Sequence, residues 1–336
     1  MASQTRNGNN AAMELIDHTT GLWRSWMIDA AVKLNLAEHL AKKPMTAEEL
    51  AEETQTHAPS LFRLLRALAS FGIFKIDNDQ KWLMTPMAQL LEKRMKHFAP
   101  MLVSDIHLAW SSLVDSVKTG KPVFENVYGE RLWDYLKSHP ADFNNFKAGL
   151  HEFNDLFHSK IPDFYDFSQF KHIIDVGGNI GSFMVYVLNR VPNVTATVYD
   201  EAHVIEEAKA YVAASEVKDR ISFISGNFLE SVPAGGDCYI MKSALVDWND
   251  DDAVKIISNI AKNMNERTRL LIIQSCIPEE NKYHLGKHYD LLYLIVDGGK
   301  ERTRKEFEAI VNKCGLRLNK VINTDLPLTD IMEIVA

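Results

Sequence analysis

The 336-residue chain lacks several motifs that would identify a common chemistry at once. It has no CxxC pair and no HExxH segment, so no metal site is indicated. It has no GxxxxGK[ST] element, which argues against a phosphate-cradling P-loop. No apolar run reaches the roughly 20 residues that span a bilayer, and the polar start has no signal-peptide core. We therefore expect a cytoplasmic protein with no metal and no membrane partner.

Cysteine and positive charge are also scarce. The three cysteines, Cys238, Cys276 and Cys314, cannot all pair, and the first two lie in apolar, strand-like runs. Reduced thiols of a cytosolic protein explain them best. The net charge of -8 argues against a nucleic-acid partner held by a general basic surface. The hydrophobic content of 46% is ample for real cores, and the length suffices for two domains.

An apolar helical region follows an expected disordered tail at residues 1–12. From Met13 onward Leu22, Trp26 and Ala30 recur at helical spacing, and neighbouring apolar side chains widen this stripe. So much apolar surface on one helix needs more than one partner. We therefore expect residues 13–98 to form a helical dimerisation region, and the protein to be a homodimer.

A winged helix is predicted inside this region. A capping box at 46–49 opens one helix, Pro59 starts a second, and 73–83 has the pattern of a hairpin. Winged helices often bind DNA, but the second helix carries only Arg63 and Arg66 among apolar neighbours. We therefore favour a structural or dimerising role over DNA binding.

Residues 99–165 are mostly helical in pattern and rich in aromatic side chains and histidine. Core packing explains most of these side chains, but some are candidates to line a pocket for a flat, partly apolar ligand. The candidates taken from this connecting region are His107, Trp110, His151 and Phe157.

After Phe170 the pattern changes to alternating strands and helices. Strands are predicted at 171–176, 195–200, 221–224, 237–244, 269–275 and 316–322. Helices are predicted between them at 182–190, 202–214, 250–263 and 303–313. This alternation is typical of an α/β, doubly wound, Rossmann-like sheet, which we expect over residues 166–336.

The first of these strands ends in a glycine-rich turn, Asp175-Val-Gly-Gly-Asn-Ile-Gly181. Glycine lets the backbone approach a ligand, and the N-terminus of the following helix offers free N–H groups. Alone, the motif also fits an ordinary tight turn. Asp200 ends the next strand about 20 residues further on, the spacing that places a carboxylate on ribose hydroxyls. Together they indicate a nucleotide-type ligand.

Five segments in order make the chain resemble a known family. They are Asp175 to Gly181, Asp200 to Ile205, Gly226-Asn-Phe228, Met241 to Trp248, and Gly298-Gly-Lys-Glu-Arg-Thr303. They are similar to the motifs of S-adenosylmethionine (SAM)-dependent O-methyltransferases of the plant caffeate and bacterial natural-product type. The resemblance extends to the winged helix, so it covers nearly the whole chain.

The resemblance implies roles for particular residues. Gly177 would approach the methionine part of SAM, and Asp200 would take the ribose hydroxyls. Phe228 would flank the adenine, and Lys242 would contact the cofactor from the end of the fourth strand. Asp175, which opens the glycine turn, belongs to the same site. S-adenosylhomocysteine (SAH) would be the product.

The catalytic motif departs from the family pattern. The family has a histidine general base before the Asp-Trp pair, where this chain has Val246 before Asp247. Two acids normally flank that histidine; one matches Glu301, but the other is replaced by Gln274. Valine cannot accept a proton, so the base and one of its orienting partners are both absent. Asp247 and Ser243 stay as candidates for substrate positioning.

Two departures touch the cofactor site. Asn227 replaces the acid of the usual Gly-Asp-Phe segment, and its amide oxygen can still accept a hydrogen bond from an amino group. Asn179 replaces the middle glycine of the turn, and asparagine tolerates left-handed backbone better than most residues. We therefore expect SAM binding to persist.

The sequence thus predicts a SAM-dependent O-methyltransferase that acts by proximity on an acidic or already ionised acceptor, aromatic or carboxylic in class. The alternative is a non-methylating enzyme on the same fold, such as a decarboxylase, hydroxylase or rearrangement catalyst, in which the positive charge of SAM assists electrostatically. A winged-helix regulator is a third, less favoured hypothesis. Neither the substrate nor the pathway follows from the sequence.

Overall fold

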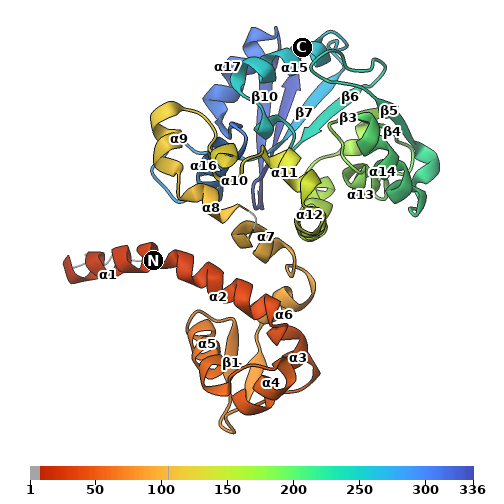
Figure 1. Cartoon of the computed structure of the whole chain (residues 1–336). Helices are drawn as coiled ribbons and strands as arrows, with labels where there is room; N and C mark the ends of the chain where they lie inside the picture. The colour runs from red at the N-terminus through yellow and green to blue at the C-terminus, as the bar shows by residue number, and fades with distance from the viewer. Residues whose placement is uncertain (1–7, 105) are drawn as a thin grey trace. The chain divides into compact units, whose positions relative to one another are not determined.

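The computed structural model describes residues 8–104 and 106–336, and these fall into two compact units (Figure 1). The first unit comprises the residues up to Leu108 together with Leu136–Phe153. The second unit comprises Ala109–Tyr135 and Asn154–Ala336. Among the described residues, no helix has both the length and the apolar character needed to cross a membrane.

Short helices and one hairpin build the amino-terminal part of the first unit. Its elements are α1 (Gly8–Thr19), α2 (Gly21–Lys33), α3 (Leu36–Lys42), α4 (Ala47–Thr54), α5 (Ala58–Ser70), β1 (Phe74–Ile76), β2 (Trp82–Met84), α6 (Pro86–Lys93) and α7 (Phe98–Ser104). Of the tail predicted at 1–12, residues 1–7 lie outside the described residues, whereas 8–12 form the first turns of α1. The helical stretch expected from Met13 onward is divided among α1, α2 and α3. Asn35, with φ 51°, lies between α2 and α3.

The predicted winged helix is confirmed. Thr46 and Glu49 make the reciprocal hydrogen bonds of a capping box at the start of α4. Leu61, Leu65 and Leu68 are the buried face of α5, as their spacing predicts. The strands β1 and β2 pair antiparallel and complete the wing.

The segment 99–165 is helical, as expected, but it is shared between the two units. Its further elements are α8 (His107–Trp110), α9 (Leu113–Thr119), α10 (Phe124–Tyr128), α11 (Leu132–Ser138), α12 (Pro140–Leu156) and the 3-10 helix η1 (His158–Asp163). In the first unit α7 packs on α2, whereas in the second unit α9 packs on α16 (Leu285–Val296). The helices of this segment thus take their partners from different cores, which the sequence pattern did not reveal.

A seven-stranded sheet in the order β10-β11-β7-β6-β3-β4-β5 forms the centre of the second unit. Its strands are β3 (His172–Val176), β4 (Thr195–Asp200), β5 (Ile221–Ser225), β6 (Cys238–Lys242), β7 (Arg269–Gln274), β10 (Arg317–Leu326) and β11 (Thr329–Val335). The first five are mutually parallel, and β11 inserts antiparallel between β7 and β10. All six predicted strands are present, whereas β11 and the helix α16 were missed.

Helices cover both faces of this sheet (Figure 1). They are α13 (Ser182–Leu188), α14 (Ala202–Ala213), α15 (Asp250–Ala261), α16 and α17 (Arg304–Lys313), and the short strands β8 (Cys276–Ile277) and β9 (Arg302–Thr303) pair beside them. Ile173 joins a core with α13 and α14, whereas its neighbour Ile174 joins a core with α15 and α17. Successive side chains of a strand point to opposite faces, so each face has its own core. The predicted Rossmann-like α/β fold is confirmed.

Candidate functional site

The candidate site lies where the parallel strands of the second unit end. Asp200 closes β4, Lys242 closes β6 and Gln274 closes β7, while Asp175 is the last but one residue of β3. Because parallel strands end at the same edge of a sheet, these side chains are gathered at one edge although they are far apart in sequence. Ligands of open α/β sheets bind outside this carboxyl edge.

The glycine-rich turn after β3 has the backbone that its sequence requires. Gly177 has φ 72° and Asn179 has φ 51°, so the left-handed conformation expected for asparagine at this position is confirmed. A Cβ on Gly178 would lie 2.8 Å from Asp175 Oδ2, so only glycine fits over that buried carboxyl. The Asn179 N–H donates to Asp200 Oδ2 at 2.8 Å and fastens the turn to the end of β4. The turn and the acid thus form one structure.

Asp200 keeps its carboxylate at the edge of the sheet. The Asn179 and Glu201 N–H groups donate to its two oxygens at 2.8 and 2.7 Å. Burial raises the pKa of Asp200, and these two backbone donors lower it again. Each carboxylate oxygen has a second lone pair, so the group can still accept from a ligand hydroxyl.

Phe228 and Asn227 follow β5 on the adjacent loop. The Phe228 ring meets Trp248 edge-on at 5.6 Å between centroids, and its Cε1 lies 3.6 Å from where a Gly177 Cβ would be. The structure therefore brings Phe228 to the glycine turn. Asn227 Oδ1 already accepts from the Leu229 N–H at 2.9 Å, so this side chain also shapes its own loop.

Asp175 is buried below the turn and interacts electrostatically with the partly buried Lys242. Asp175 is 1% exposed, and both its carboxyl oxygens lack a hydrogen-bond partner among the described residues. Burial raises the pKa of Asp175 to about 7, an effect that Lys242 opposes. Burial likewise lowers the pKa of Lys242 to about 8, which Asp175 opposes. An orphaned acid of this kind suits a ligand with positive charge or N–H donors.

His158 joins this pair and was not singled out from the sequence as a site residue. Its Nδ1 lies 3.2 Å from Lys242 Nζ and 2.5 Å from Asn154 Oδ1. Burial, and secondarily Lys242, lower the pKa of His158 well below its usual value. No sequence signal places His158 here, because Lys242 follows it by 84 positions.

The backbone joins the segment of Val246 to the segment that carries Glu301. Val246 is buried in the 3-10 turn η4 (Leu245–Asp247), and its carbonyl accepts from the Lys300 N–H at 2.7 Å. Gln274 Nε2 donates to Glu301 Oε2 at 3.4 Å, and both side chains are buried. Burial raises the pKa of Glu301 well above its usual value. The structure thus pairs the Gln274 amide with the Glu301 carboxyl and binds the Val246 backbone to the residue before Glu301.

Asp247 lies beside a second acid that was not predicted, Asp297 at the end of α16. Burial raises the pKa of Asp247 well above its usual value, and the Asp297 carboxyl adds to the rise. The pKa of Asp297 is raised to about 6, again chiefly by burial. Burial raises the pKa of Tyr293 well above its usual value, and the carboxyls of Glu301, Asp247 and Asp297 add to the rise.

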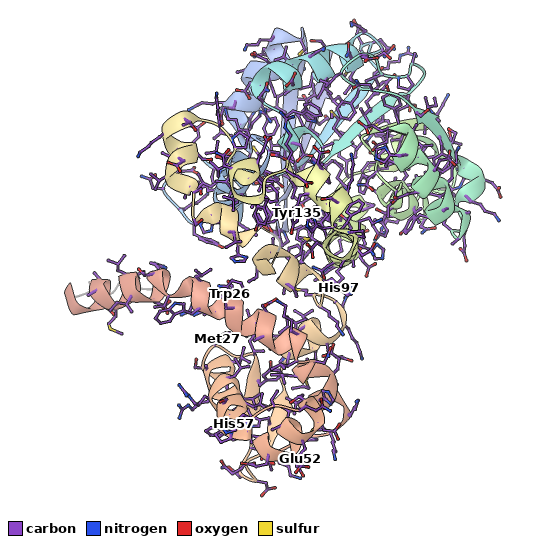
Figure 2. All side chains as sticks on the ribbon, in the orientation of Figure 1. Trp26, Met27, Glu52, His57, His97 and Tyr135 are labelled. Carbon is purple, nitrogen blue, oxygen red and sulfur yellow. The ribbon has the colours of Figure 1, made fainter. Side chains whose placement is uncertain are left out.

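The other pocket candidates are divided between the units. In the first unit the His107 ring meets Trp26 edge-on at 4.5 Å, so it packs against α2, where Figure 2 labels Trp26 and Met27. His151 is exposed on α12. His107 is therefore a packing residue and His151 a surface residue of the first unit.

Three pocket candidates belong to the second unit. Trp110 and Phe157 are partly exposed. Ser243 is exposed directly after β6 and has φ 52°, a strained backbone for a residue other than glycine. Of these three candidates, Ser243 lies at the sheet edge, directly after Lys242.

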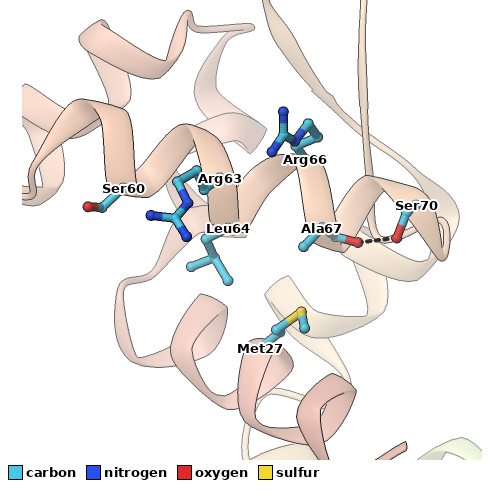
Figure 3. Close-up of a pocket in the computed structure, with 7 residues that line it drawn as sticks. All are labelled: Met27, Ser60, Arg63, Leu64, Arg66, Ala67 and Ser70. Atoms are coloured by element: carbon cyan, nitrogen blue, oxygen red, sulfur yellow. Dashed lines mark hydrogen bonds between the residues drawn. The ribbon is translucent and has the colours of Figure 1, made fainter. Parts of the chain in front are cut away.

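A separate groove occurs within the first unit (Figure 3). It lies between α2 and α5 and is lined by Met27, Ser60, Arg63, Leu64, Arg66, Ala67 and Ser70. Met27 belongs to the apolar stripe that predicted dimerisation. The groove therefore belongs to the winged-helix region rather than to the sheet edge.

Comparison with known proteins identifies the class. The O-methyltransferase domain family matches residues 110–317, and the O-methyltransferase dimerisation domain family matches 16–94. A phenazine O-methyltransferase of Lysobacter antibioticus is 34% identical over 92% of each chain. The chain belongs to the SAM-dependent small-molecule O-methyltransferases, and the resemblance noted from its motifs is confirmed.

Solved structures agree with this assignment. A methyltransferase of calicheamicin biosynthesis, solved in its SAH-bound form, has a TM-score of 0.89. It is 26% identical over 98% of this chain and 99% of that one. An O-methyltransferase of neocarzinostatin biosynthesis, solved with SAM and 2-hydroxy-5-methyl naphthoic acid, has a TM-score of 0.76 with 26% identity over 93% and 95%. SAM is thus the cofactor of this class, and the orphaned Asp175 and the glycine turn fit it.

Proposed function

We propose that this protein transfers the methyl group of SAM to an oxygen of a small aromatic or carboxylic acceptor that arrives ionised. The observation that carries the proposal is Val246, an aliphatic side chain at the position of the usual base, with Gln274 beside Glu301 in place of a second acid. The relatives described above are named for methyl transfer, which favours this function over the non-methylating alternative.

The cofactor would be held by the residues gathered at the sheet edge. SAM supplies an electrophilic methyl group on a positively charged sulfur. Asp200 would accept the ribose hydroxyls and Phe228 would flank the adenine, while Gly177 lets the backbone approach the methionine part. Asp175 and Lys242 would offer a paired negative and positive charge to the amino-acid end. In support, Asp175 has no partner for either carboxyl oxygen among the described residues.

The acceptor would then react by positioning alone. A general base contributes typically about 10²–10⁴-fold to a rate, and its absence is tolerable when the nucleophile is already an anion. A simple phenol with a pKa near 10 is mostly neutral at pH 7, whereas a carboxylate, an acidic phenol or an enolised dicarbonyl is ionised. Holding reactants aligned in a water-poor site supplies the remainder. The neocarzinostatin relative was solved with 2-hydroxy-5-methyl naphthoic acid, which is an aromatic carboxylic acid.

We also propose that the functional form is a homodimer built on residues 13–90. The dimerisation family match supports this. So do the exposed apolar side chains of the first two helices, of which Leu22 is 58% and Trp23 62% exposed. Exposed apolar surface of this kind usually marks an interface.

The decisive experiment is a panel of acceptors graded by pKa and assayed against pH. The rate should follow ionisation of the acceptor and become nearly flat above its pKa. Efficient turnover of high-pKa phenols at neutral pH would reveal a base that the proposal denies. Failure to methylate any acceptor, in protein that binds SAM tightly, would overturn the activity itself.

A further inference from the structure

Lys242 has a hydrogen-bonding partner that no motif of the sequence identified. Its Nζ lies 3.2 Å from His158 Nδ1. Asp175 interacts with Lys242 electrostatically, but both Asp175 carboxyl oxygens lack a hydrogen-bond partner among the described residues. His158, rather than Asp175, therefore fixes the Lys242 ammonium group by a directed contact.

Packing holds His158 in a defined position. It opens the 3-10 helix η1 directly after α12, and it is only 5% exposed. The helix η1 packs against α13, and the buried Phe183 ring of α13 has its centroid 5.9 Å from Lys242 Nζ. The Lys242 ammonium group is thus within reach of two buried rings, and a cation is attracted to the face of an aromatic ring at this distance.

The charge states of the two side chains complement each other. Burial, and secondarily Lys242, lower the pKa of His158, so the ring is neutral. A neutral imidazole has one nitrogen without a proton, and an ammonium group has donors only. Lys242 in its charged form therefore donates to His158 when Nδ1 is the nitrogen without a proton.

Asn154 contacts the same nitrogen from the preceding helix α12. Its Oδ1 lies 2.5 Å from His158 Nδ1. Because Nδ1 carries either one proton or one lone pair, it either donates to Asn154 or accepts from Lys242. A carboxylate next to Lys242 would favour the charged form of the lysine, and so the arrangement in which Nδ1 accepts.

Of these groups, Lys242 is the one that is open to a ligand. It closes β6 at the carboxyl edge of the sheet and is partly exposed, whereas Asp175 and His158 are buried. His158 therefore acts on a ligand through Lys242 and not by touching the ligand itself.

We propose that His158 is a positioning residue for the cofactor: it accepts a hydrogen bond from Lys242 and so holds the ammonium group as the partner of the SAM α-carboxylate. This rests on the proposed function in placing Lys242 at the amino-acid end of SAM. The consequence is selective. Loss of the acceptor on residue 158 weakens ligands that carry the carboxylate and spares ligands that lack it.

The test compares two ligands by calorimetry. One is SAH, and the other is decarboxylated SAH, which keeps the amino group and lacks only the carboxylate. The quantity of interest is the carboxylate preference, which is the ratio of the two dissociation constants. We expect Lys242→Met to reduce this preference about 10–100-fold, the range for a hydrogen bond to a charged group.

Two variants of matched size separate the acceptor of His158 from its packing. His158→Leu should reduce the carboxylate preference about 3–10-fold, because Lys242 remains but has lost its partner. His158→Asn should keep the preference within about twofold of the wild type, because the asparagine oxygen stands in for Nδ1 as an acceptor. Added to Lys242→Met, His158→Leu should change the preference by less than about twofold, since the two residues act as one unit.

The control is His57→Leu, the same change at an exposed histidine of the first unit. Far-ultraviolet circular dichroism checks that each variant is folded, and His158→Met replaces the leucine variant if that one does not fold. If His158→Leu leaves the carboxylate preference unchanged, or if His158→Asn loses it as His158→Leu does, the proposal is overturned. An unchanged preference in Lys242→Met would overturn the proposal together with the placement of Lys242 at SAM. Because only binding is measured, a failure to methylate any ionised acceptor would refute the proposed function alone.

Discussion

Replacing Asp175 by Asn should stabilise the protein without SAM and weaken its binding of SAM. Asp175 is fully buried at the end of β3, and its pKa rises from 3.8 to about 7. A group whose pKa is higher in the folded than in the unfolded protein stabilises the folded state at pH values below the unfolded pKa. This stability is lost as the pH rises through the folded pKa. The folded protein should therefore lose stability between about pH 4 and pH 7, and asparagine removes this loss.

The size of the effect follows from the same value. One pKa unit corresponds to about 1.4 kcal/mol, so the rise from 3.8 to about 7 costs the folded protein about 4 kcal/mol above pH 7. The Asn variant avoids this cost, but it also loses the Asp175 carboxylate that favours the charged form of Lys242, which offsets part of the gain in stability. We expect a net gain of about 2–4 kcal/mol at pH 8, or roughly 3–6 °C in melting temperature for a chain of this length. At pH 5 Asp175 is protonated in the folded protein but largely ionised in the unfolded chain, so the gain should fall to about 1–2 kcal/mol.

Thermal unfolding of the SAM-free protein at pH 5 and pH 8 measures the stability, and calorimetry with SAM measures the binding. A group retained for a cationic ligand should show both effects, with SAM binding at least about tenfold weaker in the variant. Glu266→Gln serves as the control, because it removes one carboxylate at an exposed position. The reasoning fails if Asp175→Asn is destabilised at pH 8, if the gain is the same at both pH values, or if SAM binds undiminished.

Three further outcomes are expected. Val246→His should extend turnover to weakly acidic phenols at neutral pH, by up to about 10²-fold, provided that the new imidazole reaches Glu301; an unchanged acceptor profile in a folded variant would place the base position elsewhere. Gln274→Glu alone should not raise the rate and should lower the melting temperature, because it adds an unpaired carboxyl to a buried site beside Glu301; a large rate gain would show that the pair is wrongly assigned. Light scattering should give about twice the 38.2 kDa chain mass, and Trp23→Asp on the exposed face of α2 should shift it toward the monomer; a wild-type monomer at micromolar concentration would contradict the dimer.

Local signals in the sequence were enough to predict most of the elements. The alternation after Phe170 placed five parallel strands and their helices, because strand and helix periods are properties of neighbouring residues. The left-handed Asn179 and the capping box at Thr46 were likewise predicted, since each depends on a few consecutive residues. The strand β11 was missed: it runs antiparallel and is buried between β7 and β10, so it carries no alternating pattern to mark it.

The site was predicted only as far as single residues match a family pattern. Asp200, Lys242 and Glu301 could be proposed as site residues because each ends or lies within a recognisable segment. The groups that set their chemistry come from elsewhere: His158 reaches Lys242 across 84 positions, and Asp297 faces Asp247 from the end of a helix that was not predicted. Their proximity depends on how β6, η1 and α16 close around the sheet edge. Thus the sequence determined which elements form and that valine stands where the family pattern has histidine, whereas burial and long-range packing decided which acids have raised pKa values and which acceptors are left without a partner.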